Sequence, residues 1–233
     1  MTFDRIVTIG DDVLGPAFGA PDLAPRGLDR RRPDARHEHR GAPREEARVA
    51  VPTSVALLRG INVGGRNLIR MPALKACFEE NGFDDVVTYI QSGNVVFTAP
   101  TTPATELTRR IEAMLAQAFD YVPTVVVRTR RQMRAIVDGA PKGFGTEPAK
   151  YRYDLIFLKE PLAAKVALQS VPTKPGVDAA HPGTGVLYFS RLSAKASQSR
   201  LSRVVSSPIY PSVTIRNWNT STRLLSMMDE RHT

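Results

Sequence analysis

The segment at residues 59–67, R-G-I-N-V-G-G-R-N, has the composition of an anion-binding loop. Glycines let the backbone curl so that several N–H groups point at one negatively charged group. Arginines and asparagines can add positive charge and amide hydrogen bonds. We therefore expect this segment to bind a phosphate or another anion through Arg59, Asn62, Gly64, Gly65, Arg66 and Asn67. The alternative is a strand-to-helix connection that only turns the chain.

The glycine spacing must also be compared with that of a nucleotide-hydrolysing loop. Gly60 and Gly65 are separated by four residues, as in a phosphate-binding P-loop. However, Arg66 and Asn67 stand where that loop requires lysine and then serine or threonine. The helix predicted to follow also begins several residues too late. The sequence therefore argues against a Walker-type NTPase.

Two further polar clusters lie at predicted element ends, in residues 89–94 (Y-I-Q-S-G-N) and 214–220 (T-I-R-N-W-N-T). In the first cluster, Gly93 and Asn94 favour a tight hairpin turn. In the second cluster, asparagine is a preferred residue at the start of a helix, and we expect Asn219 to cap the last helix. We expect the ligand site to be completed by Gln91, Ser92, Asn94, Arg216 and Asn217.

The chain offers little that resembles a catalytic centre. His181 is the one histidine inside the predicted folded body, and Cys77 shares a helical face with Leu74 and Phe78. That pattern favours a buried thiol over a nucleophile. No spaced set of His, Asp and Glu suits a metal ion. We therefore predict no metal and no cofactor, and whether the protein is an enzyme is left open.

The elements needed to position these clusters begin near residue 54. Residues 1–52 lack periodicity and are rich in Gly, Pro and charge, which is typical of a disordered extension, or of a stretch ahead of a truer start at Val49 or Val51. Beyond it, short apolar runs alternate with amphipathic segments. The pattern predicts an α+β fold with two β-α-β-β-α-β halves, at 53–147 and 148–233.

The predicted elements of the first half are strands at 54–58, 86–91, 95–98 and 122–129, with helices at 72–81 and 102–119. A connecting helix is predicted at 131–138. The second half is predicted to have strands at 151–158, 176–181, 186–191 and 213–216. Its helices are predicted at 161–169, 198–206 and 219–228. Each half then resembles a ferredoxin-like arrangement, in which helices cover one face of an antiparallel sheet.

Charge indicates the class of partner. The net charge is +9. All of it arises after residue 50, because residues 1–50 contain nine arginines and nine acidic residues, which leaves 23 basic and 14 acidic residues beyond them. Such a field favours anionic partners. We expect an anionic, phosphorylated small molecule or nucleotide; the alternatives are RNA or DNA, and a group-transfer enzyme that uses Ser92 or Arg216.

Apolar runs are too short to span a bilayer, where about 20 residues are needed, so no membrane partner is expected. A single cysteine excludes an internal disulfide and fits a reducing compartment, which predicts a cytoplasmic location. The oligomeric state is left open.

Three strings carry a resemblance to a known family. They are A-L-L-R-G-I-N-V-G-G (56–65), T-Y-I-Q-S-G-N-V-V-F (88–97) and T-I-R-N-W-N-T (214–220). Together they resemble the bacterial domain of unknown function 1697 family, over about residues 54–228. The resemblance implies an α+β fold of two ferredoxin-like halves and implies no reaction. It also implies an S-K-L element before the last helices, where this chain has Ser199, Arg200 and Leu201.

Overall fold

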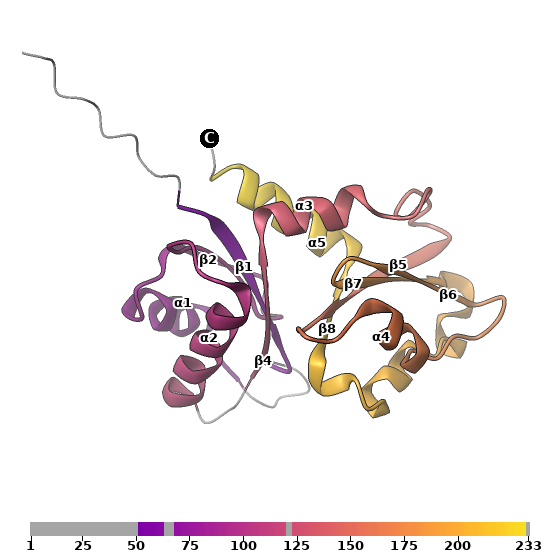
Figure 1. Cartoon of the computed structure of the whole chain (residues 1–233). Coiled ribbons are helices and arrows are strands. Elements are labelled where there is room, and N and C mark those ends of the chain that lie inside the picture. The colour runs from indigo at the N-terminus through magenta and orange to yellow at the C-terminus, as the bar shows by residue number, and fades with distance from the viewer. Residues whose placement is uncertain (1–50, 63–67, 120–122, 232–233) are drawn as a thin grey trace, which may run out of the picture. The chain divides into compact units, whose positions relative to one another are not determined.

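The computed structural model describes residues 51–62, 68–119 and 123–231. The predicted extension at 1–52 therefore lies almost entirely outside the described residues. All described residues fall in one compact unit, which spans Arg48–Thr233. The fold is α+β, with two four-stranded antiparallel sheets and covering helices (Figure 1).

The first sheet contains β1 (Thr53–Arg59), β2 (Asp84–Tyr89), β3 (Asn94–Thr98) and β4 (Thr124–Thr129). Its strands lie in the order β2-β3-β1-β4, and every neighbouring pair is antiparallel. Helices α1 (Met71–Glu80) and α2 (Ala104–Ala118) connect strands of this sheet. Both are amphipathic, so each buries an apolar stripe against the sheet.

The second sheet contains β5 (Tyr151–Leu158), β6 (Asp178–Gly183), β7 (Val186–Leu192) and β8 (Val213–Asn217). Its order, β6-β7-β5-β8, places the strands of the second half in the same relative order as those of the first. Helix α3 (Arg130–Asp138) links the two sheets, α4 (Ala164–Ser170) follows β5, and α5 (Trp218–Asp229) follows β8.

The helix predicted at 198–206 is not an α-helix in the structure. The chain there forms short 3₁₀ helices, η1 (Ser193–Gln198), η2 (Leu201–Ser206) and η3 (Tyr210–Ser212). Serines are frequent in this stretch and compete for backbone hydrogen bonds, while Pro208 and Pro211 lack an N–H group. Short 3₁₀ turns therefore replace an α-helix.

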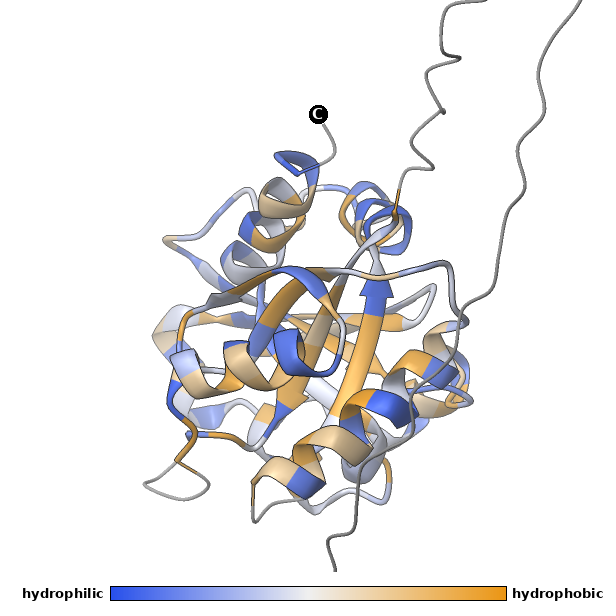
Figure 2. Ribbon diagram, turned by 90° about the vertical axis from the view of Figure 1, so that its left-hand side faces the viewer, coloured by the Kyte–Doolittle hydropathy of each residue, from blue (hydrophilic) through white to orange (hydrophobic). Residues whose placement is uncertain are grey.

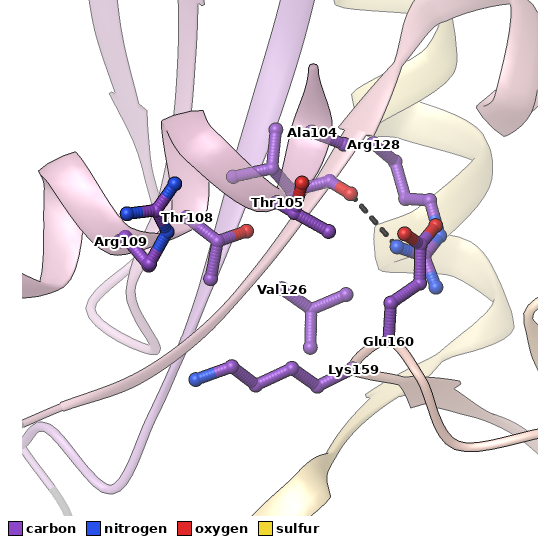
Figure 3. A pocket seen from close by; sticks show the side chains of 9 residues that line it. Ala104, Thr105, Thr108, Arg109, Val126, Arg128, Lys159 and Glu160 are labelled. Atoms are coloured by element: carbon purple, nitrogen blue, oxygen red, sulfur yellow. Dashed lines mark hydrogen bonds between the residues drawn. The ribbon is translucent and has the colours of Figure 1, made fainter.

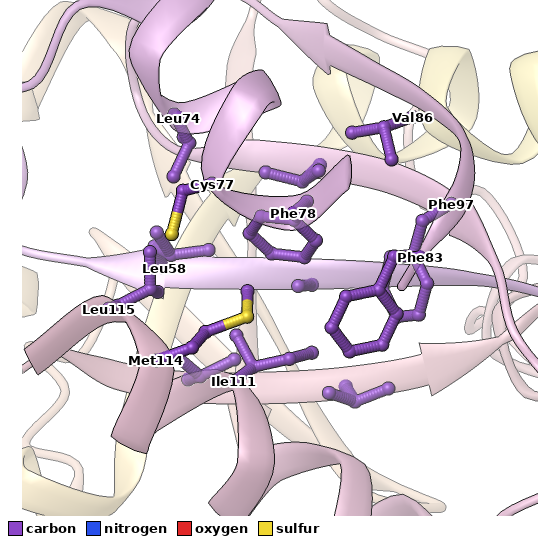
Figure 4. Close-up of a cluster of buried hydrophobic side chains, with 14 of the residues drawn as sticks. Leu58, Leu74, Cys77, Phe78, Phe83, Val86, Phe97, Ile111, Met114 and Leu115 are labelled. Atoms are coloured by element: carbon purple, nitrogen blue, oxygen red, sulfur yellow. The ribbon is translucent and has the colours of Figure 1, made fainter. Parts of the chain in front are cut away.

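The core of the first half lies between its sheet and helices α1 and α2. Phe78, Phe83 and Phe97 pack with ring centroids 4.9–5.6 Å apart (Figure 4). Cys77 lies in the same cluster and is buried, as predicted. Burial, and secondarily the charge of Glu80, raise the pKa of its thiol. The thiol is therefore a packing group in this cluster.

A second apolar cluster joins the two sheets. Alternate residues of β1, such as Val55 and Leu57, share this cluster with Leu155 and Phe157 of β5. The residues between them on each strand face the other way, so both strands are buried on two faces. The apolar strands run between polar-faced helices (Figure 2). Helices α3 and α5 border this shared core, and Asp229 holds them together through Arg130 at 3.3 Å and Arg134 at 2.6 Å.

None of the helices in the described residues combines the length and apolarity needed to cross a bilayer.

Candidate functional site

The glycine-rich loop leaves β1 through two residues with left-handed backbone, Gly60 at φ 79° and Asn62 at φ 54°. Asn62 then ties the loop together. Its Nδ2 donates to the carbonyl of Ile69 at 2.9 Å and to the carbonyl of Gln91 at 3.1 Å, while its Oδ1 accepts from the Ile69 N–H at 2.8 Å. Asn62 therefore closes the loop and fastens it to the β2–β3 hairpin. Gly64, Gly65, Arg66 and Asn67 lie outside the described residues.

The hairpin turn is organised by Asn94, which is fully buried. Its Nδ2 donates to the carbonyl of Tyr89 and to the hydroxyl of Ser92, both at 3.0 Å. Ile90 has φ 48°, which is a strained conformation for a β-branched residue, and its side chain is 48% exposed. The turn thus holds an apolar side chain out into solvent beside Gln91.

Arg216 of β8 reaches this turn from the other sheet. Its Nε donates to Asn94 Oδ1 at 2.5 Å, and its Nη2 donates to the carbonyls of Leu58, Ser92 and Gly93 at 2.6, 2.9 and 3.1 Å. Burial lowers the pKa of Arg216 to about 10, so the side chain stays cationic at neutral pH. The guanidinium joins the end of β1, the hairpin and β8 in one buried contact.

Arg59 contacts a different region. Its Nη2 donates to Thr124 Oγ1 at 2.8 Å, its Nη1 donates to the carbonyl of Tyr210, and its guanidinium carbon lies 4.3 Å from the centre of the Tyr210 ring. These contacts connect β1 and β4 to η3. Among the described residues, the Arg59 partners therefore lie on the side of β4 and η3.

Asn217, not Asn219, caps the last helix. Its Oδ1 accepts from the N–H of Thr220 at 2.7 Å. The prediction failed because β8 runs straight into α5, so the last strand residue is already the N-cap. Trp218 is partly buried against the shared core.

A cavity of about 260 Å³ lies where the loop meets the hairpin. We call it the loop corner, and it is lined by Asn62, Leu68, Ile69, Arg70, Met71 and Gln91. Two predicted ligand residues, Asn62 and Gln91, line it. The structure therefore brings these two together at an open cavity, and it joins Ser92, Asn94 and Arg216 through hydrogen bonds.

A family model for "Protein of unknown function (DUF1697)" matches residues 51–188, which is more than half of the chain. The chain belongs to the DUF1697 family. The family resemblance is thereby confirmed over the first two sequence strings, while the third, at 214–220, lies beyond the matched residues. No curated protein matches.

The DUF1697 chain is similar in fold to the conserved bacterial protein SP0830 from Streptococcus pneumoniae, with a TM-score of 0.67 and 24% sequence identity. The match covers 77% of this chain and 99% of that protein. At this identity the likeness concerns the fold alone.

Sequence patterns in this DUF1697 protein did not indicate a hollow between α2, β4 and the end of β5 (Figure 3). Its volume is about 170 Å³, and it is bordered by Thr108, Arg109, Arg128 and Lys159. Lys159 is paired with Glu112 at 2.6 Å. Arg128 is buried, and its Nη2 donates to the carbonyls of Leu158 and Gly185 at 2.5 and 2.9 Å. Two of the cations that border the hollow, Arg128 and Lys159, are thus already engaged. No local sequence motif could have located the hollow.

Proposed function

We propose that this DUF1697 protein binds an anionic small molecule, of the phosphorylated or nucleotide class, at the loop corner. The observation that carries the proposal is the pair of hydrogen bonds that Asn62 donates, one to the carbonyl of Ile69 and one to the carbonyl of Gln91. A loop that needed only to turn would not require a tie to the hairpin. This tie supports a cavity of defined shape between two polar segments.

The anionic group would lie at the start of α1. Arg70 occupies the N-cap position and makes no side-chain capping bond within the described part of the chain. The first intrahelical bond runs from the Leu74 N–H to the Arg70 carbonyl, which leaves the N–H groups of Met71 and Ala73 without an intrahelical acceptor. Such groups and the helix dipole favour a phosphate. Arg70 is exposed and adds a positive charge beside them.

The rest of the loop corner suits an apolar or aromatic part of the ligand. Leu68 is 76% exposed and Ile90, next to Gln91, is 48% exposed. Exposed large apolar side chains beside a cavity are typical of a binding surface. Together with Met71, they favour a nucleotide over inorganic phosphate. In this proposal Arg216, Asn94 and Asn62 position the site, because their side chains already bond to the protein.

The strand order of each sheet, second-third-first-fourth, supports our assignment of both halves to ferredoxin-like arrangements. The single cysteine supports a cytoplasmic location, where phosphorylated metabolites are found.

The test is calorimetric titration with adenosine monophosphate, adenosine and inorganic phosphate. We expect saturable one-site binding of the nucleotide, with weaker binding of either part. Arg70→Gln should weaken nucleotide binding about tenfold or more, since a bond to a charged group is lost. Arg131→Gln on α3 removes an exposed arginine elsewhere and should leave affinity unchanged.

The proposal is overturned if none of these ligands produces binding heat or a thermal shift. Binding of an oligonucleotide that falls steeply with salt, without one-site mononucleotide binding, would instead favour the nucleic-acid alternative.

A further inference from the structure

The second sheet has a notch where β8 ends. Strand β8 pairs with β5 only from Asp154 to Leu158, because the chain turns into α5 after Asn217. Residues 151–153 of β5 therefore have no strand partner on this side within the described chain. A cavity of about 270 Å³ lies here and borders Arg152, Asp154, Arg191 and Trp218.

The notch carries an excess of positive charge. Arg152 of β5 and Arg191 of β7 lie directly opposite each other in the sheet register. Like charges at opposite positions repel, so an anion between or beside such a pair stabilises it. Among the described residues, Asp154 is the one carboxylate that lines the notch, and its Oδ2 lies 3.2 Å from Arg191 Nη2. The two arginines and the one carboxylate that line the notch therefore leave a net charge of +1.

Two buried polar atoms of the notch lack hydrogen bonds. Neither Arg191 Nε nor Asp154 Oδ2 has a hydrogen-bond partner among the described residues, although the two side chains form an ion pair. Burial raises the pKa of Asp154, and the charges of Arg191 and Arg152 oppose that shift only in part. Buried polar groups are nearly always satisfied, so these two atoms indicate a missing partner. Such a partner must accept a bond from Arg191 and donate one to Asp154.

We propose that the notch binds a small monocarboxylate that carries a neutral hydrogen-bond donor next to its carboxylate. The carboxylate would pair with Arg152 and Arg191, since guanidinium forks match its planar geometry. The donor, a hydroxyl or an amide N–H, would bond to Asp154. A monoanionic ligand balances the single excess positive charge of the notch. A ligand whose donor is an ammonium group would be neutral overall and would leave that excess charge in place. Tyr151 and Trp218 also line the notch and suit an aromatic substituent.

This site is separate from the loop corner and does not depend on the proposed nucleotide binding. None of the residues that the structure describes lines both cavities. The two proposals can therefore fail independently, and a variant of one site serves as a control for the other.

The probes are mandelate, which has a hydroxyl beside its carboxylate, and N-acetylphenylglycine, which has an amide N–H in the same place. Phenylacetate lacks the donor and mandelamide lacks the charge. Titration of the full chain should show saturable binding of at least one of the first two. Which of the two binds identifies the donor. Phenylacetate and mandelamide should each bind at least about tenfold more weakly.

Arg152→Gln changes an exposed side chain and should lower affinity for the binding probe about tenfold without unfolding the protein. Arg191→Gln should lower it further. Arg70→Gln, at the loop corner, and Arg223→Gln, on the exposed face of α5, should leave it unchanged. The proposal is overturned if neither donor-bearing probe binds, if phenylacetate binds as tightly as mandelate, or if Arg152→Gln binds like the parent.

Discussion

Arg216 and Asn94 are 122 residues apart in the sequence, yet the Nε of the first donates to the Oδ1 of the second at 2.5 Å. Asn94 in turn donates to Tyr89 and Ser92, and so determines the course of the hairpin. The guanidinium of one sheet therefore shapes a turn of the other. This relationship makes Arg216 a positioning residue for the loop corner.

Replacing Arg216 by methionine should lower the free energy of unfolding by at least about 3 kcal/mol, because the acceptors at Leu58, Ser92, Gly93 and Asn94 lose a buried donor. Urea denaturation followed by tryptophan fluorescence measures the change. Arg223→Met, which removes an exposed ion pair with Glu230, should lower the free energy of unfolding far less, because exposed ion pairs contribute little to stability. A loss in Arg216→Met no larger than in this control would contradict the assigned role.

Gly93 should be intolerant of a side chain. It has φ 76°, and a Cβ at this position would lie 2.7 Å from Ile61 Cδ1 and 2.9 Å from Leu58 Cβ. Gly176 has a similar φ of 71° but no atom within 4 Å of such a Cβ. Both alanine variants should incur a backbone cost of about 1 kcal/mol. Gly93→Ala should lose a further ~1–3 kcal/mol through overpacking, measured by chemical denaturation. Equal losses would show that the turn can relax.

Asp154→Asn should change how stability depends on pH. Burial raises the pKa of Asp154 above 3.8, so the folded state holds this proton more tightly than the unfolded state. The stabilisation of the folded state that this tighter proton binding provides is then fully present below pH 3.8, and it is lost as pH rises through the raised pKa. The unfolding free energy of Asp154→Asn minus that of the parent should therefore increase with pH above 3.8. Urea titrations at several pH values measure it, and a flat difference would contradict the prediction.

Asp229 provides a control of opposite sign. Burial alone would raise its pKa, but the hydrogen bonds and the charges of Arg134 and Arg130 together outweigh burial and lower it. Its contribution is present above pH 3.8 and is lost as pH falls through the lowered pKa. The unfolding free energy of Asp229→Asn minus that of the parent should thus rise as the solution becomes more acidic.

Much of the element order could be predicted from local patterns. The short apolar runs predicted as strands at 54–58 and 95–98 are β1 and β3, and the helix predicted at 72–81 is α1 within one residue at each end. The strand predicted at 176–181 is β6, displaced by two residues, and it tolerates Pro182 because it lies at a sheet edge. Local spacing decides these elements, since each signal lies within the element itself.

The partners of the site residues could not be predicted in the same way. Arg216 has the side chain of a ligand residue, but four of its acceptors lie 122–158 positions earlier in the chain. Asn217 and Asn219 are equally suited to cap a helix, and only the absence of a linker after β8 decides between them. The notch arises from strand register, because Asp154 is simply the last β5 residue that β8 reaches.

The apolar cluster shared by β1 and β5 also constrains how this protein can evolve. A gene fragment for either half would leave Val55 and Leu57, or Leu155 and Phe157, facing water. Each half thus needs the other to cover its apolar residues, as the subunits of a permanent heterodimer do. Substitutions on one side of that shared surface must be matched on the other, even where the outer faces diverge freely.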